Sequence, residues 1–145
     1  MKNEFLRHTI STIKYRFEKS VLNSTDQFGE FNLGKGSRNP IELINHMYQV
    51  LYSTRIFLEE ERLNTEPPEK LSLTKEIERF NHELINTDKA LEESELPVNY
   101  AKKLLQGPFS DILTHIGQIS MLQRLHGRPI KGEDFSAASI KTGRS

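Results

Sequence analysis

The chain has 145 residues, and its 20 lysine and arginine side chains are balanced by 20 aspartate and glutamate side chains. A formal net charge of zero argues against a broad surface for nucleic acid or anionic membrane, since both need a positive excess. The absence of cysteine excludes disulfides, thiolate metal sites and a cysteine nucleophile. Apolar runs are far shorter than the ~20 residues that span a bilayer, and the charged N-terminus has no apolar signal-peptide region. We expect one soluble, cytoplasmic domain over residues 1–145.

Two helices are predicted in the first half of the chain. Apolar residues recur at spacings of three and four over residues 3–22, which is one face of a helix. A second helix is predicted over residues 40–63. Asn39 is a good N-cap for it, Pro40 suits the first helical position, and Glu42 stands where a carboxylate can complete a capping box.

The second half of the chain predicts two further long helices. Residues 73–93 combine a periodic apolar face with charged residues elsewhere, and residues 108–126 repeat this pattern. Gly107 and Pro108 mark the entry to the last helix, and a short helix is predicted over 97–106 just before it.

The predicted helices define the fold class. Each is too weak to be stable alone in water, so their apolar faces should pack together. We predict an all-α, up-and-down four-helix bundle, in which the second and fourth helices run parallel. The short extra helix precedes the last bundle helix. Residues 24–38 form an irregular loop, and residues 127–145 form an irregular C-terminal tail.

Two polar residues stand in the apolar sector of the last helix. At about 100° per residue, Asp111 and His115 fall beside the isoleucines of that face. They are four residues apart, so their side chains are neighbours. An unpaired carboxylate is expensive to bury, so a proton, a cation or a metal ion must compensate it.

His46 is a third candidate, beside the apolar stripe of the second helix. It lies six residues after Pro40, whereas Asp111 and His115 lie three and seven residues after Pro108. With a rise of about 1.5 Å per residue, parallel helices would bring all three to a similar height.

Two imidazoles and one carboxylate are a suitable ligand set for one divalent transition metal, and they leave a coordination position open. Zinc, nickel, manganese and iron all fit these ligands. Each residue also has a simpler interpretation. Asp111 can stabilise the helix dipole, His115 can be a hydrogen-bonded core histidine, and His46 can be a partly exposed surface residue.

Further residues are candidates for the surroundings of this site. Gln118, one turn beyond His115, could hold a ligand in place, and Glu42, four residues before His46, could do the same. The loop 24–38 could cover the mouth of the site.

Two segments resemble the DinB-like group of metal-binding helical bundles. They are NPIELINHMYQVLY (39–52) and GPFSDILTHIGQISMLQRLHGRPIKGEDF (107–135), of which His-x-Gly-Gln at 115–118 is the most specific part. The resemblance implies a four-helix bundle whose metal has one ligand on the second helix and two, four residues apart, on a later one. The matching positions here are His46, Asp111 and His115. Many members have histidine where this chain has Asp111, and arginine where it has Ile116.

The functional hypothesis is a metal-dependent transferase or hydrolase that activates water or a low-molecular-weight thiol toward a small molecule. Some members of the DinB-like group use such a thiol, and the catalytic residues themselves are left unassigned. The alternative is a non-catalytic bundle with a structural or sensing metal. A homodimer is expected in either case, because amphipathic bundles associate readily through exposed helix faces.

Overall fold

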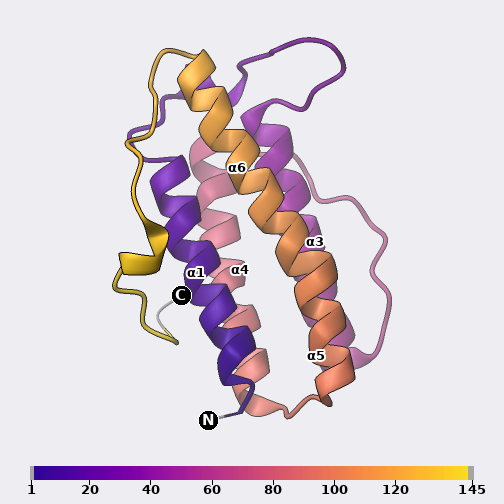
Figure 1. Cartoon of the computed structure of the whole chain (residues 1–145). Coiled ribbons are helices and arrows are strands. Elements are labelled where there is room, and N and C mark those ends of the chain that lie inside the picture. The colour runs from indigo at the N-terminus through magenta and orange to yellow at the C-terminus, as the bar shows by residue number, and fades with distance from the viewer. Residues whose placement is uncertain (1, 144–145) are drawn as a thin grey trace.

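Four long helical segments pack side by side in the computed structural model, which describes residues 2–143 (Figure 1). The long segments are α1 (Glu4–Ser20), α3 (Pro40–Glu60), α4 (Leu73–Glu93) and a continuous run of α5 (Val98–Leu104), η1 (Leu105–Phe109) and α6 (Ser110–Leu125). Two short elements, α2 (Asp26–Gly29) and η2 (Phe135–Ala137), lie in the connecting segments. Residues 2–143 contain no β-strand, so the prediction of an all-helical bundle is confirmed.

The apolar faces predicted from the sequence meet in one core. Phe17 of α1 and Phe80 of α4 are fully buried, and their ring centroids lie 4.7 Å apart. Ile44 of α3 and Ile112 of α6 complete the same cluster. Because burying one such side chain is worth roughly 1.5–3 kcal/mol, this shared core stabilises helices that would not persist alone.

The start of α3 follows its sequence signal closely. The side chain of Asn39 accepts a hydrogen bond from the backbone N–H of Glu42 at 2.8 Å, and the carboxylate of Glu42 accepts one from the backbone N–H of Asn39 at 3.1 Å. This capping box satisfies two backbone donors that the first turn leaves unpaired. The helix ends at Glu60, three residues before the predicted end, because Glu61 adopts a left-handed conformation with φ 53°.

The short helix predicted before the last bundle helix is present as α5, but Gly107 and Pro108 do not separate it from α6. Both residues lie inside a π-helical turn that joins α5 to α6 without interruption. Pro108 has no N–H to donate within a helix, and a wider turn accommodates such a defect. The hydroxyl of Ser110 donates to the carbonyl of Leu105 at 2.5 Å, which satisfies that acceptor. The predicted extra helix is therefore the first part of the last bundle helix.

The up-and-down topology is wrong. Asn45 of α3 pairs with Glu76 of α4, and Arg55 pairs with Glu83 further along both helices, so α3 and α4 run parallel. Residues 61–72 return along the length of the bundle to make this possible (Figure 1). A fully extended segment of this size reaches about 40 Å, which exceeds the roughly 31 Å length of α3.

The return segment is held by a buried carboxylate. Glu76 is fully buried, and it accepts hydrogen bonds from the backbone N–H of Leu71, from Asn45 and from Arg79 at 2.7–3.0 Å. Asn45 also donates to the carbonyl of Glu69 at 3.1 Å. These bonds fix the end of the segment against α3 and α4.

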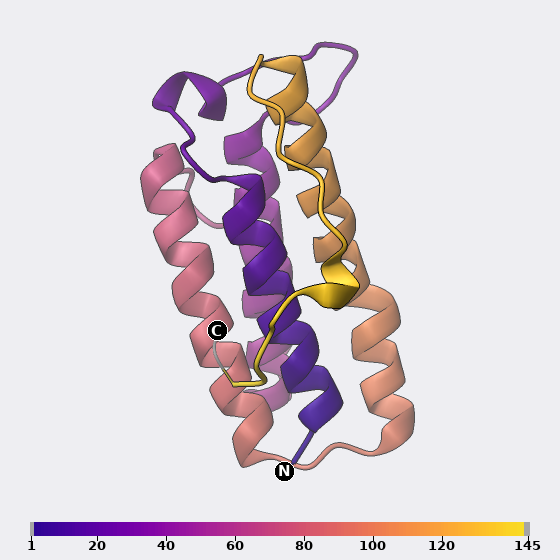
Figure 2. The ribbon, with the colours of Figure 1, turned by 60° about the vertical axis from the view of Figure 1, so that its left-hand side comes forward.

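The C-terminal segment crosses α1 instead of extending from the bundle (Figure 2). Glu133 pairs with Lys19 and accepts a hydrogen bond from Tyr15 at 2.9 Å. The ring of Phe135 packs edge-on against Tyr15 and lies under the guanidinium of Arg16, 3.9 Å from its centroid. Apart from η2, the described part of the predicted tail is irregular, and residues 144–145 lie outside the described part.

Candidate metal centre

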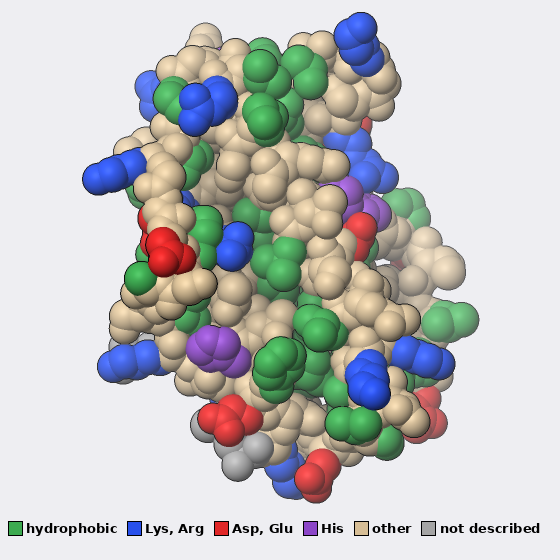
Figure 3. Space-filling view, in the orientation of Figure 1, with side chains coloured by type: hydrophobic (Ala, Val, Ile, Leu, Met, Phe, Trp, Pro, Cys, Tyr) green, Lys and Arg blue, Asp and Glu red, His purple; other side chains and the backbone are tan. Residues whose placement is uncertain are grey.

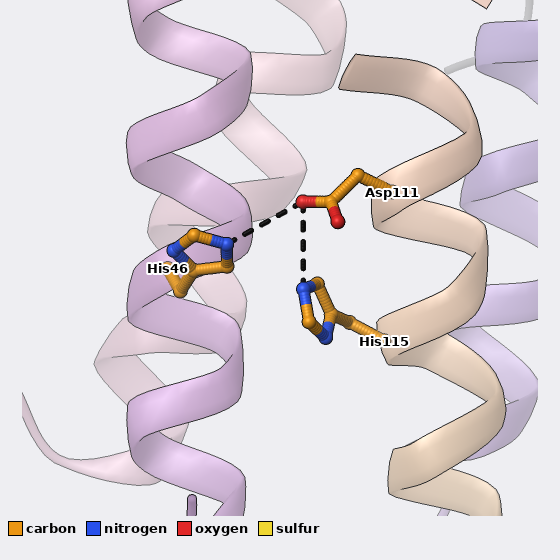
Figure 4. A group of neighbouring side chains, drawn as sticks. All are labelled: His46, Asp111 and His115. Atoms are coloured by element: carbon orange, nitrogen blue, oxygen red, sulfur yellow. Dashed lines mark ion pairs between the residues drawn. The ribbon is translucent and has the colours of Figure 1, made fainter. Parts of the chain in front are cut away.

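The structure brings His46, Asp111 and His115 together between α3 and α6. Figure 4 shows the imidazole of His46 facing the two side chains that project from successive turns of α6. One potential ligand atom from each residue lies within 4.8 Å of the other two. The three residues singled out in the sequence therefore form one cluster.

The helix directions differ from those that suggested this cluster. Leu43 of α3 borders the same hollow as Leu122 of α6, whereas Thr54, later on α3, borders a second hollow with Gly107. The two helices are therefore antiparallel. His46 meets α6 because it lies near the start of α3 and opposite the middle of the α5–α6 run. The similar heights that were predicted by counting residues from the start of each helix therefore do not explain this contact.

The distances in the cluster suit a small metal ion. The Nε2 atoms of His46 and His115 each lie 3.4 Å from Oδ2 of Asp111. The two rings are almost perpendicular, with centroids 4.9 Å apart. A tetrahedral ion bound at about 2.0–2.2 Å separates its ligand atoms by roughly 3.3–3.6 Å, so both histidine–aspartate distances fit.

Gln118 determines how His115 presents its ring. Nδ1 of His115 lies 2.8 Å from Oε1 of Gln118, and an oxygen acceptor places the ring proton on Nδ1. Nε2 is then left with a lone pair directed at the cluster. This Nε2 atom is buried and has no hydrogen-bond partner among the residues that the structure describes. Gln118 therefore contacts one of the candidate ligands, and its role in supporting a metal site stays a prediction.

The burial of the three residues is uneven. The side chain of His115 is 10% exposed, whereas the side chain of Asp111 is 44% exposed. The expectation that Asp111 faces the apolar interior is therefore wrong. Its carboxylate lies at the edge of a polar hollow of about 860 Å³ between α3 and α6, which reaches the surface and lets water solvate it. Solvation lowers the cost of an ionised Asp111 before any cation binds.

The surroundings of His46 keep its ring neutral. Its pKa is lowered from 6.5, first by burial, then by the positive charge of Arg38 and by the neighbouring His115, while Asp111 opposes the shift. A neutral imidazole is the form that binds metal. A neutral His46 also provides no full positive charge to balance Asp111.

Glu42 does not join the cluster. Its carboxylate closes the capping box of α3 and lies 3.7 Å from Nζ of Lys70. Within residues 2–143 it has no hydrogen bond or ion pair with His46, Asp111 or His115. Its contacts stabilise the start of α3, and none of them supports the predicted role near the metal.

Part of the loop 24–38 does border the site. Its last residues, including Leu33 and Arg38, line a hollow with His115 and Gln118. Sequence reasoning did not identify Arg38. The available signal was its place immediately before the capping box, which fixes it at the start of the helix that carries His46.

No protein-family model, curated protein sequence or solved structure matches the chain. Among the described residues, no helix combines the length and the apolar character that crossing a membrane requires.

Proposed function

We propose that this protein binds one divalent transition-metal ion through His46, Asp111 and His115. The observation that carries the proposal is Nε2 of His115, which is buried, unpartnered and directed at a carboxylate oxygen 3.4 Å away. A buried nitrogen lone pair and a carboxylate oxygen repel each other without a positive group between them. Their ligand types fit zinc, nickel, manganese or iron.

The position of the cluster favours a catalytic metal over a structural one. The core is formed by apolar side chains of α1, α3, α4 and α6, and this packing does not depend on a bridging ion. His115 borders one hollow, whereas His46 and Asp111 border the other, so a small molecule can reach the ligands. Structural metal sites are usually closed by four protein ligands.

We further propose that the protein is a metal-dependent transferase or hydrolase acting on a small molecule. When bound, the ion would act as a Lewis acid that lowers the pKa of a water or of a low-molecular-weight thiol. Gln118 would fix the ring of His115, and the neutral ring of His46 would complete the ligand set. The group formed by His46, Asp111 and His115 agrees with the ligand pattern that the DinB-like resemblance implies. This agreement supports the proposal and supports membership in that group.

Metal analysis tests the binding. Protein purified without a polyhistidine tag should retain, or take up on titration, one equivalent of zinc, nickel, manganese or iron(II). His115→Ala and Asp111→Asn should each abolish stoichiometric binding. His82→Ala is the matched control, because His82 is exposed on α4. Equal metal uptake by the wild type and His115→Ala would disprove the site.

An activity test then separates the two classes of metal protein. Metal-loaded protein should turn over small electrophiles or hydrolysable esters, with and without an added thiol, and His115→Ala should not. Full metal occupancy without turnover in either assay would leave a structural or sensing ion as the function.

A further inference from the structure

A hollow of about 470 Å³ opens beside the candidate metal ligands, and we call it the Arg38 hollow. It has the size of a small-molecule pocket, which is roughly 300–1,000 Å³. His115 and Gln118 form the part of its lining nearest the cluster. Four apolar side chains form much of its remaining wall: Leu33, Leu43, Met121 and Leu122.

Two of these apolar side chains are poorly covered. Met121 is 57% exposed and Leu33 is 47% exposed, although both belong to the wall of a concave site. An apolar body in the hollow would remove this surface from water, which is favourable in proportion to the area covered. The wall therefore fits an organic ligand better than a hydrated ion.

The hollow also contains one uncompensated positive charge. Arg38 is the only lysine or arginine in its lining, and within residues 2–143 it has no ion pair or hydrogen bond. Arg38 directly precedes the capping box of α3, the helix that carries His46, and it lines the hollow together with His115. In Figure 3, basic side chains lie beside the histidine and acidic side chains that come to the surface near α3 and α6.

A single guanidinium indicates the type of anion. Its fork matches one carboxylate through two parallel hydrogen bonds. Phosphate groups carry more charge and are usually held by several donors, and among the described residues the lining has no second lysine or arginine. The neighbouring polar hollow is a poorer place for an anion, because Asp111 borders it and no lysine or arginine of residues 2–143 does.

We propose that the Arg38 hollow binds a small carboxylate with an apolar body, and that this is the substrate class of the metal site. The carboxylate pairs with Arg38, and the apolar body covers Leu33 and Met121. The ligand then lies against His115, beside the proposed ion. This inference rests on the proposed function, since it assigns the ligand to the metal centre.

Methyl NMR tests the proposal with defined probes. Protein labelled with [¹³C-methyl]methionine is first titrated with zinc and then with octanoate or octylamine, which share a chain and differ in charge. Octanoate should shift the Met121 signal to saturation and leave that of the buried Met47 almost unchanged, whereas octylamine should shift neither. Met121→Leu assigns the signal.

Arg38→Gln should weaken octanoate binding about tenfold, since it removes a charged hydrogen bond at an exposed position. Lys35→Gln is the matched control, because it removes the same charge from the same loop without altering the lining. No shift of Met121, or equal weakening by both variants, would overturn the inference while zinc binding stands. Failure of the zinc titration itself would refute the proposed function, and the inference with it.

Discussion

Removal of the Gln118 side chain should weaken metal binding without unfolding the protein. Its amide oxygen accepts a hydrogen bond from Nδ1–H of His115 at 2.8 Å, and this bond keeps Nε2 unprotonated toward Asp111. Gln118 is exposed on α6, so Gln118→Ala should change the free energy of unfolding by no more than about 0.5 kcal/mol. The variant therefore isolates the orientation of one ligand.

The size of the effect follows from the exposure of this bond. Loss of a group that orients a metal-bound histidine usually lowers affinity about 10–100-fold. Because water can reach Gln118 and replace part of the bond, we expect a loss near tenfold, or about 1.4 kcal/mol of binding free energy. Gln118→Glu keeps an acceptor at the same place and adds a negative charge, so it should bind zinc at least as tightly as the wild type.

Isothermal titration calorimetry with zinc measures these affinities directly. Gln49→Ala is the control, because Gln49 borders the polar hollow near His46 but has no hydrogen bond to any of the three ligands. Wild-type affinity in Gln118→Ala, or an equal loss in Gln49→Ala, would refute the role assigned to the Gln118–His115 bond.

Four further results are expected. Glu76→Ala should lower the free energy of unfolding in urea by about 3 kcal/mol, because it leaves buried donors without their acceptor; a change below about 1 kcal/mol would contradict this. Gly29→Ala should cost about 1–3 kcal/mol by overpacking, since its Cβ would lie 2.9 Å from the Cβ of the first residue of α4, and a neutral change in melting temperature would show that α2 can shift. Zinc at about 100 times its Kd should add about 2.7 kcal/mol of stability, seen as a higher melting temperature in the wild type but not in His115→Ala. The pairs with Lys19 and Tyr15 hold the pKa of Glu133 below its usual 4.5. The contact therefore stabilises the C-terminal segment above pH 4.5, and this stabilisation is lost as the pH falls through the lowered pKa. Amide hydrogen exchange in residues 134–143, corrected for the intrinsic rate, should show this transition in the wild type and not in Glu133→Gln.

Local sequence determined most of the helices and part of the candidate site. The spacing of apolar residues fixes which face of a helix is buried, and this information is contained within each segment. The capping box at Asn39 and Glu42 is also local, because both partners lie within one turn. The same holds for Asp111 and His115, whose separation of four residues makes them neighbours in any helix.

Tertiary structure decided the direction in which the helices run. An apolar stripe specifies which side of a helix is covered, but its pattern reads the same for a parallel and an antiparallel neighbour. The choice here is associated with residues 61–72, whose contacts with the buried Glu76 and with Asn45 cannot be located from local periodicity. His46 therefore meets Asp111 and His115 between antiparallel helices, although the sequence argument assumed parallel ones.

The same distinction explains the surroundings of the site. The sequence placed Asp111 in an apolar sector, but only the packing of α3 against α6 shows that a polar hollow exposes it to water. Arg38 belongs to an irregular loop, where no periodicity fixes the direction of a side chain. Residue identity thus determined which groups were available for chemistry, and long-range packing determined which of them face one another, because side-chain proximity between helices depends on loop paths and helix directions together.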